Sequence, residues 1–88
     1  MFTQKDIRLC SDPYFTVLRM CLEDNYIELK SKNTSHCWII KKIAAKTTLY
    51  HKHSETDAYY HKHSLMFTVS QAIEQIKSHD TYVLEHKN

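Results

Sequence analysis

A five-residue word, YHKHS, occurs twice in this chain, at 50–54 and again at 60–64. A segment that contains the same word twice can fold back on itself as an antiparallel hairpin, with its tip near Asp57. The sequence therefore predicts a long hairpin over 47–66, and this hairpin restricts how the remaining segments can be arranged.

Side chains alternate between the two faces of a strand, so a mirror register sorts the doubled word into two sets. The expected pairs are Leu49 opposite Leu65, His51 opposite His63 and His53 opposite His61. The reverse face then carries tyrosines and lysines, namely Tyr50, Lys52, Tyr60 and Lys62, with Lys52 opposite Lys62. Residues that face each other in a ladder have Cβ atoms about 4.5–5.5 Å apart. We therefore expect four imidazoles on one surface, close enough for shared chemistry.

The segment before the hairpin also has the pattern of strands. From Tyr14 the apolar residues recur with a period of two, which is typical of a half-buried strand. The chain contains no glycine, so tight turns must use residues such as asparagine and aspartate. A two-residue turn at Asp24 and Asn25 implies a register with Leu22 opposite Ile27, Met20 opposite Leu29 and Arg19 opposite Lys30.

The run 36–40, HCWII, is apolar on both faces, which is expected of a central strand covered on two sides. Trp38 in this run is expected to lie in the core. Residues 2–12 fit either a short helix or an edge strand, and Pro13 ends whichever forms.

The pattern changes to a helical one after residue 67. Thr68 and Gln71 have the spacing of a capping box. The apolar stripe that follows has the i, i+3, i+4, i+7 spacing of an amphipathic helix and consists of Val69, Ala72, Ile73 and Ile76. We predict a helix over about 69–79, followed by a short strand or extended segment at 82–84.

Together these patterns predict one α+β domain over residues 1–88. It consists of an antiparallel β-meander of about five strands, with one C-terminal helix packed on one face of the sheet. A chain of 88 residues is long enough for one modest core and too short for two.

Composition narrows the class of protein. No stretch approaches the ~20 apolar residues of a membrane span, and the N-terminal residues lack the pattern of a secretion signal. We therefore expect a cytoplasmic protein without a membrane partner. The cysteines, Cys10, Cys21 and Cys37, are odd in number and lack CxxC spacing, which favours reduced thiols.

The formal net charge is +2, but basic residues are concentrated in one window. From Leu29 to Ser54 there are six lysines and three histidines, and no carboxylate. Such a segment is the usual electrostatic footprint of a phosphate-bearing partner, and neighbouring tyrosines suit the stacking of single-stranded bases. We therefore expect a nucleic-acid-binding module whose contact residues are Lys30, Lys41, Lys42, Tyr50, Lys52, Tyr60 and Lys62.

A metal site is an alternative reading of the hairpin. Neutral imidazoles are common ligands of zinc, copper and nickel. The four histidines of the doubled word, His51, His53, His61 and His63, are the candidate ligands, and zinc or another transition metal is then the cofactor.

Two further readings involve the same region. A pair of histidines can act as general base and general acid in phosphodiester cleavage, but nothing in the sequence places such a pair on a substrate. An exposed strand edge can also dock a protein, which would make the chain an inhibitor or accessory factor. The remaining histidines, His36, His79 and His86, are assigned no function.

Overall fold

The computed structural model describes residues 1–86, which form a five-stranded antiparallel sheet with two helices on one face. The elements are α1 (Gln4–Cys10), β1 (Phe15–Cys21), β2 (Tyr26–Ser31), β3 (Cys37–Ile43), β4 (Lys46–Lys52), β5 (His61–Met66) and α2 (Val69–Glu85). The strands lie side by side in chain order. The predicted α+β fold, a β-meander followed by a helix on the sheet, is confirmed.

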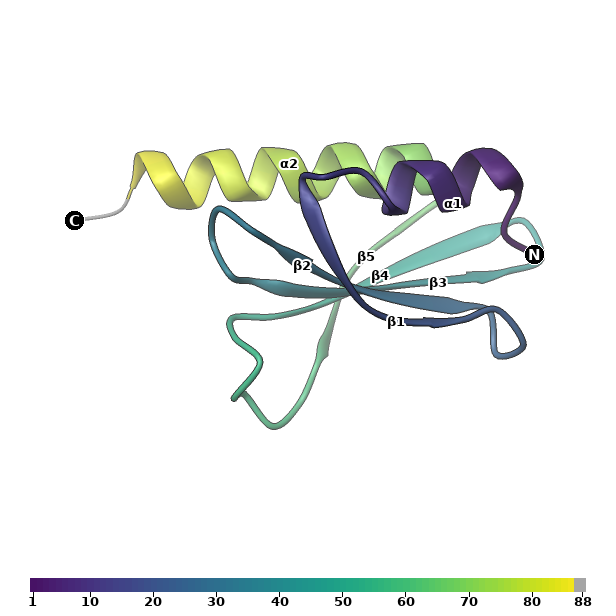
Figure 1. Ribbon diagram of the computed structural model, residues 1–88, viewed down its shortest axis with the longest axis horizontal. Helices are drawn as coiled ribbons and strands as arrows, with labels where there is room; N and C mark the ends of the chain where they lie inside the picture. Colours follow the sequence, from purple (N-terminus) through teal and green to yellow (C-terminus); the bar gives the residue numbers. More distant parts are fainter. Residues whose placement is uncertain (87–88) are drawn as a thin grey trace.

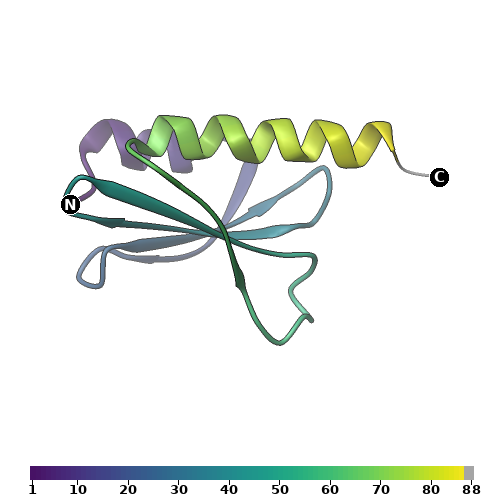
Figure 2. The ribbon, with the colours of Figure 1, turned by 180° about the vertical axis from the view of Figure 1, so that it is seen from behind.

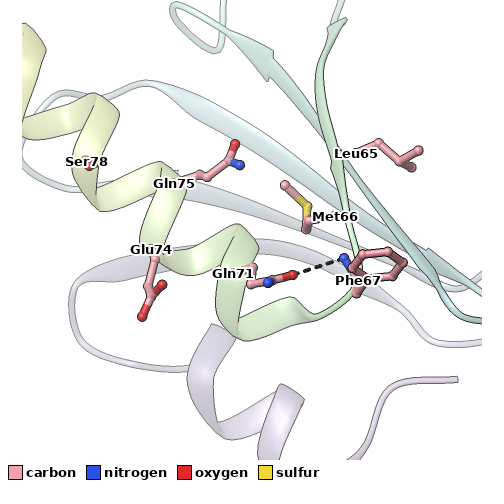
Figure 3. A pocket seen from close by; sticks show the side chains of 7 residues that line it. All are labelled: Leu65, Met66, Phe67, Gln71, Glu74, Gln75 and Ser78. Atoms are coloured by element: carbon pink, nitrogen blue, oxygen red, sulfur yellow. Dashed lines mark hydrogen bonds between the residues drawn. The ribbon is translucent and has the colours of Figure 1, made fainter.

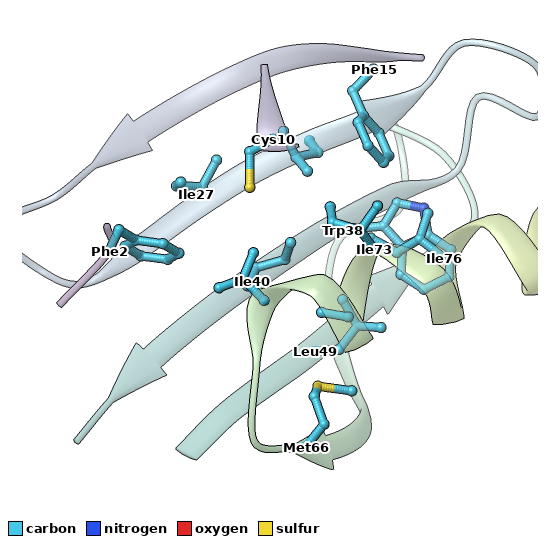
Figure 4. Close-up of a cluster of buried hydrophobic side chains, with 13 residues drawn as sticks. Phe2, Cys10, Phe15, Ile27, Trp38, Ile40, Leu49, Met66, Ile73 and Ile76 are labelled. Carbon is cyan, nitrogen blue, oxygen red and sulfur yellow. The ribbon is translucent and has the colours of Figure 1, made fainter. Parts of the chain in front are cut away.

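The sheet has two faces of different character. Both helices lie along one of them, which we call the helix face, while the long β4–β5 loop extends from the opposite side, which we call the open face (Figures 1 and 2). Alternate side chains of the central strands point to the helix face and are buried, as in Ile27, Trp38 and Leu49. They pack against Ile73 and Ile76 of α2 to form the core (Figure 4).

Both helices begin with a capping box. In α2 the Thr68 side chain accepts from the backbone N–H of Gln71, whose own side chain accepts from Thr68 N–H, as predicted. Thr3 and Asp6 make the same exchange at the start of α1. Each box satisfies two backbone donors that a helix N-terminus otherwise leaves without a partner. The helical alternative for residues 2–12 is therefore the one that forms.

Helix α2 is longer than predicted, since it runs to Glu85. The expectation of a strand or extended segment at 82–84 is wrong. The apolar stripe ends because its next inward position is Asp80, which is fully buried. This carboxylate accepts hydrogen bonds from Tyr14 and Thr34, so the helix continues with a polar residue in a buried position.

The predicted β1–β2 register is also wrong. The connection spans residues 22–25 rather than two residues, and Cys21 pairs with Tyr26. A bulge between Val17 and Arg19 shifts the register further along the strand. Arg19 consequently lies opposite Glu28 instead of Lys30, so the expected like-charge contact is replaced by an opposite-charge pair.

The β4–β5 hairpin forms, but not in the mirror register. His51 lies opposite His61, and Leu49 lies opposite Ser64. The partner of His51 is shifted by two residues from the expected His63, and a shift of two keeps the histidines on one face. The partner of Leu49 is shifted by one residue from the expected Leu65, and a shift of one places Leu65 on the other face. The expected pairs His51 with His63, His53 with His61 and Leu49 with Leu65 are therefore wrong.

Two features of the hairpin explain this register. Residues 53–60 form a loop rather than a symmetrical tight turn, and Tyr60 folds onto the open face, where its hydroxyl donates to Glu28 at 2.6 Å. His63 is an extra residue between the paired positions Lys62 and Ser64, which makes a β-bulge.

Neither a disulfide nor a membrane-spanning helix occurs in residues 1–86. The thiols of Cys10, Cys21 and Cys37 are free, as expected. Burial raises the pKa of Cys10 to about 12, so this thiol stays protonated at neutral pH. Neither helix is long and apolar enough to cross a bilayer.

The register of the hairpin can be tested with two leucines on neighbouring strands. Leu49→Ala removes a fully buried side chain and should lower the free energy of unfolding by about 2–5 kcal/mol. Leu65→Ala should change it by less than about 0.5 kcal/mol, because Leu65 is 53% exposed. Urea unfolding of both variants measures the difference. An equal loss of unfolding free energy in the two variants would contradict the observed register and support the mirror register.

Because the chain contains no glycine, other residues must adopt positive φ in its turns, and this leads to a second prediction. Within residues 1–86, three residues have positive φ: Asn25 (59°), Ser35 (64°) and Ala44 (54°). An alanine in this region carries a steric cost that glycine avoids. Ala44→Gly should therefore raise the free energy of unfolding by roughly 0.5–1 kcal/mol.

Ala45 is the matched control, because it follows Ala44 in the same β3–β4 turn and is not among the residues with positive φ. Ala45→Gly should leave the stability unchanged or lower it. Thermal and urea unfolding of the two variants would contradict the steric argument if both glycines had the same effect.

Candidate functional site

Six histidines from four parts of the chain lie together at one end of the helix face. They are His36 from the β2–β3 loop, His51 in β4, His53 just after it, His61 and His63 in β5, and His79 in α2. We call this group the histidine cluster. It contains the four imidazoles predicted from the doubled word and two that were assigned no function.

The centre of the cluster is a trio made by His36, His51 and His79. Their ring centres are 5.0 Å apart for His36 and His51, 4.7 Å for His51 and His79, and 5.4 Å for His36 and His79. One ring nitrogen from each lies within 4.8 Å of the other two. A hydrogen bond of 2.9 Å joins His36 Nδ1 and His51 Nε2.

Strand and helix periodicity explain why these three residues meet. His51 follows Leu49 by two positions on β4, so it shares the helix face. His36 precedes Trp38 by the same interval on the approach to β3. His79 follows the buried Ile76 by three positions, which places it on the flank of the buried stripe of α2.

Trp38 forms the inner wall of the cluster. Its ring centre lies 4.2 Å from that of His51 and 5.1 Å from that of His79. The indole N–H donates to Ser31 Oγ at 3.1 Å, which fixes the ring. The indole therefore separates the imidazoles from the aliphatic core and keeps water away from their inner side.

The buried carboxylate of Asp80 ties the segments that carry His36 and His79 to the rest of the fold. Asp80 of α2 accepts from the Tyr14 hydroxyl at 2.6 Å and from the Thr34 hydroxyl at 2.9 Å. Thr34 Oγ1 in turn accepts from the backbone N–H of His36 at 3.2 Å. Because Asp80 is adjacent to His79, this chain of hydrogen bonds fixes the helix and the loop that carry two of the three rings.

The cluster keeps its central rings neutral. Burial, reinforced by the neighbouring histidines, lowers the pKa of His51 to about 3. Burial also lowers the pKa values of His36, His63 and His79 below the ordinary imidazole value. At neutral pH these rings carry a free nitrogen lone pair, which is the form that binds metals.

One polar atom in the cluster has no partner. His79 Nδ1 is buried and makes no hydrogen bond within the described chain. Such a group costs roughly 1–3 kcal/mol unless something satisfies it. The trio therefore contains a buried ring nitrogen whose hydrogen-bonding capacity is unused.

The geometry is close to what a metal ion requires. A tetrahedral ion with Zn–N bonds of about 2.0–2.1 Å separates its ligand nitrogens by roughly 3.3–3.4 Å. The trio already lies within 4.8 Å, so side-chain movements on the order of 1 Å would bring all three into contact with one ion.

The other three histidines surround the trio on its solvent side. His53 stacks on His36 with ring centres 5.1 Å apart, and His63 lies 5.6 Å from His79. His61 lies 5.2 Å from His51. All three are exposed, so the cluster is closed by Trp38 on the inside and open to solvent on the outside.

The residues predicted to contact nucleic acid are placed elsewhere. Alternation along the strands puts most of them on the open face: Lys30, Lys41, Tyr50, Lys52 and Lys62, with Tyr60 folded over it. Lys42 is the exception, because it forms an ion pair of 2.7 Å with Asp6 at the helix layer. The predicted opposition of Lys52 and Lys62 is wrong, since Lys62 pairs with Tyr50.

A hollow of about 460 Å³ lies at the edge of the sheet where β5 meets α2 (Figure 3). Apolar residues of β5, such as Met66, and polar residues of α2 line it together, and Gln71 accepts from the backbone N–H of Phe67 at its rim. Phe67 is 77% exposed here. This edge is where the predicted docking of a protein would occur.

Sequence reasoning missed His36 and His79. Both can be found from sequence periodicity. His36 lies two positions before Trp38 and so falls on the same face of the strand, and His79 lies three positions after Ile76 and so falls beside the apolar stripe of the helix. The patterns were followed only through apolar residues, so a polar residue on the same face was not included.

Comparison of the chain with protein-family models, with curated proteins and with solved structures found no match. The site is therefore interpreted from its own geometry.

The lowered pKa values predict how the free energy of unfolding depends on pH when a chelator is present. Unfolded imidazoles titrate near 6.5, whereas His51 in the fold titrates near 3, so the unfolded chain binds more protons between these values. The contribution of neutral His51 to the free energy of unfolding should be fully present above pH 6.5 and should be lost progressively as the pH falls below this value. His51 alone removes up to about 1.4 kcal/mol per pH unit.

The measurement is urea unfolding from pH 7.5 to 4.5. His51→Gln should flatten the acid-side slope, since its side chain no longer titrates. His86→Gln should keep the slope of the parent chain, because the His86 ring lies outside the cluster, stacked on Tyr82. A slope unaffected by His51→Gln would contradict the assignment.

Proposed function

We propose that this protein binds one transition-metal ion, of the zinc class, through His36, His51 and His79. The observation that carries the proposal is the convergence of three ring nitrogens within 4.8 Å of one another. The neutral state of the rings and the unsatisfied Nδ1 of His79 support it.

The ligand chemistry selects the class of ion. Imidazole suits zinc, copper and nickel, whereas calcium and magnesium take oxygen ligands. The trio contains no carboxylate. Three protein ligands leave a fourth tetrahedral position to a water or to one of the exposed flanking rings, His53 or His63.

The ion would fasten α2 to the sheet. His51 belongs to β4, His36 precedes β3 and His79 belongs to α2, so one ion would add a third kind of contact to the apolar packing and the Asp80 hydrogen bonds that already hold α2 in place. A ligand that binds only the folded state stabilises it, by about 2.7 kcal/mol at a free concentration 100 times Kd. Metal binding and folding stability are therefore coupled.

The proposal predicts one bound zinc per chain in protein that is free of affinity tags. Elemental analysis after purification without chelators measures the stoichiometry. Cobalt substitution should give the visible bands of a tetrahedral site, and added zinc should raise the melting temperature.

Single substitutions locate the ligands. His51→Gln and His79→Gln should each weaken zinc binding by at least about 100-fold, more than the loss of an outer-shell partner costs. The control is His86→Gln, which should bind as the parent chain does. His79 is only half-buried, so its variant tests the site even if His51→Gln fails to fold. Absence of stoichiometric metal, or equal loss in His86→Gln, would contradict the proposal.

The other readings of the sequence stay predictions. Docking of a protein partner at the β5 edge would make the chain an inhibitor or accessory factor. Phosphodiester cleavage by a histidine pair lacks a positioned substrate. A cytoplasmic location remains the expectation from sequence, and contact with nucleic acid depends on the open face.

A further inference from the structure

The open face of the sheet carries a second candidate site, on the side away from the histidine cluster. A pocket of about 410 Å³ lies over its centre, within the ~300–1,000 Å³ range of small-ligand sites. Its walls are three tyrosines, one isoleucine, one glutamate and one lysine: Tyr26, Tyr50, Tyr60, Ile39, Glu28 and Lys41.

The aromatic walls are held in place. The Tyr60 hydroxyl donates to Glu28 at 2.6 Å, which draws the β4–β5 loop onto the sheet. Burial and this hydrogen bond raise the pKa of Tyr60, so the phenol remains a donor. Lys52 Nζ lies over the Tyr60 ring, 4.7 Å from its centre. The pocket is therefore preformed and lined by rings suited to stacking.

The charge around the pocket is positive. Arg19, Lys30, Lys41, Lys52 and Lys62 lie on this face with Glu28, and Glu55 reaches Lys30 from the β4–β5 loop. Both carboxylates have partners, since Glu55 pairs with Lys30 at 2.7 Å and Glu28 accepts from Tyr60. Among residues 1–86, no ion pair involves Lys41 or Lys62. These two lysines are available to an anion.

The two free lysines lie on either side of one tyrosine. Lys62 is the β5 partner of Tyr50, and Lys41 is its diagonal neighbour on β3, since Lys41 pairs with Thr48. Directly opposite and diagonal neighbours lie within about 8 Å in a sheet. A ring stacked on Tyr50 would therefore have an ammonium group available on each side.

We propose that the open face binds single-stranded nucleic acid, with one base in the tyrosine-lined pocket and the adjoining phosphates on Lys41 and Lys62. Stacked aromatic bases and neutralised phosphates are the two contacts such strands offer. Duplex bases are already stacked and cannot enter the pocket. The unneutralised positive charge favours this partner over a proline-rich peptide, the other chain that aromatic grooves accept.

Binding of fluorescein-labelled dT10 and rU10 by anisotropy, from 20 to 200 mM salt, tests the proposal. Two phosphate contacts predict a slope of log K against log salt near −1.4, at about −0.7 per contact. Lys41→Gln should reduce the slope by about 0.7. Tyr50→Leu should weaken binding on the order of 10- to 100-fold with the slope unchanged.

Lys5→Gln is the matched control, because it removes the same charge from α1 on the other side of the sheet. It should bind as the parent chain does. Lys41 is on the surface, so its variant tests the site even if Tyr50→Leu is destabilised. The same titrations with chelator present should agree, since the site uses none of the histidine trio.

Three outcomes would overturn the proposal. The first is no binding of either strand at 20 mM salt. The second is equal or tighter binding of the matched duplex, or of a proline-rich peptide. The third is an equal loss in Lys41→Gln and Lys5→Gln, which would mean attraction by net charge without a site.

Discussion

The burial of the His51 imidazole is the constraint on which the histidine cluster depends. His51 is 2% exposed, enclosed between Trp38 and α2, and its lowered pKa keeps the ring neutral at neutral pH. A buried polar ring needs partners. His36 supplies one through the 2.9 Å hydrogen bond, and the position of His79 completes a set of nitrogens. The packing of α2 on the sheet therefore brings the three imidazoles together beside the ring of Trp38.

The two faces of the sheet carry different kinds of polar side chain. The helix face combines an aliphatic core with a patch of neutral imidazoles, whereas the open face combines tyrosines with lysines. This division follows from strand alternation, because HKH within one strand sends its histidines and its lysine in opposite directions. The bulge at His63 modifies the rule locally by placing an additional ring beside Trp38, at 5.6 Å between centres.

More of the fold than of the candidate site could be predicted from the sequence. Alternation, the spacing of Thr68 and Gln71, and the doubled word were sufficient for the meander, the start of α2 and the hairpin. Register could not be predicted, because it depends on the Tyr60 hydroxyl bonding to Glu28 across the sheet and on two bulges. The extent of α2 was missed for a related reason: Asp80 is acceptable in a buried position only because Tyr14 and Thr34, distant in sequence, donate to it.

The trio draws its rings from positions 36, 51 and 79, so its members are separated by up to half the length of the chain. Loop closure over such distances occurs only when the sheet has formed and α2 has docked. A nascent or partly folded chain would contain histidines without containing the site. Occupancy would thus report the completion of folding, and each ion would be captured by a finished molecule rather than guide its assembly.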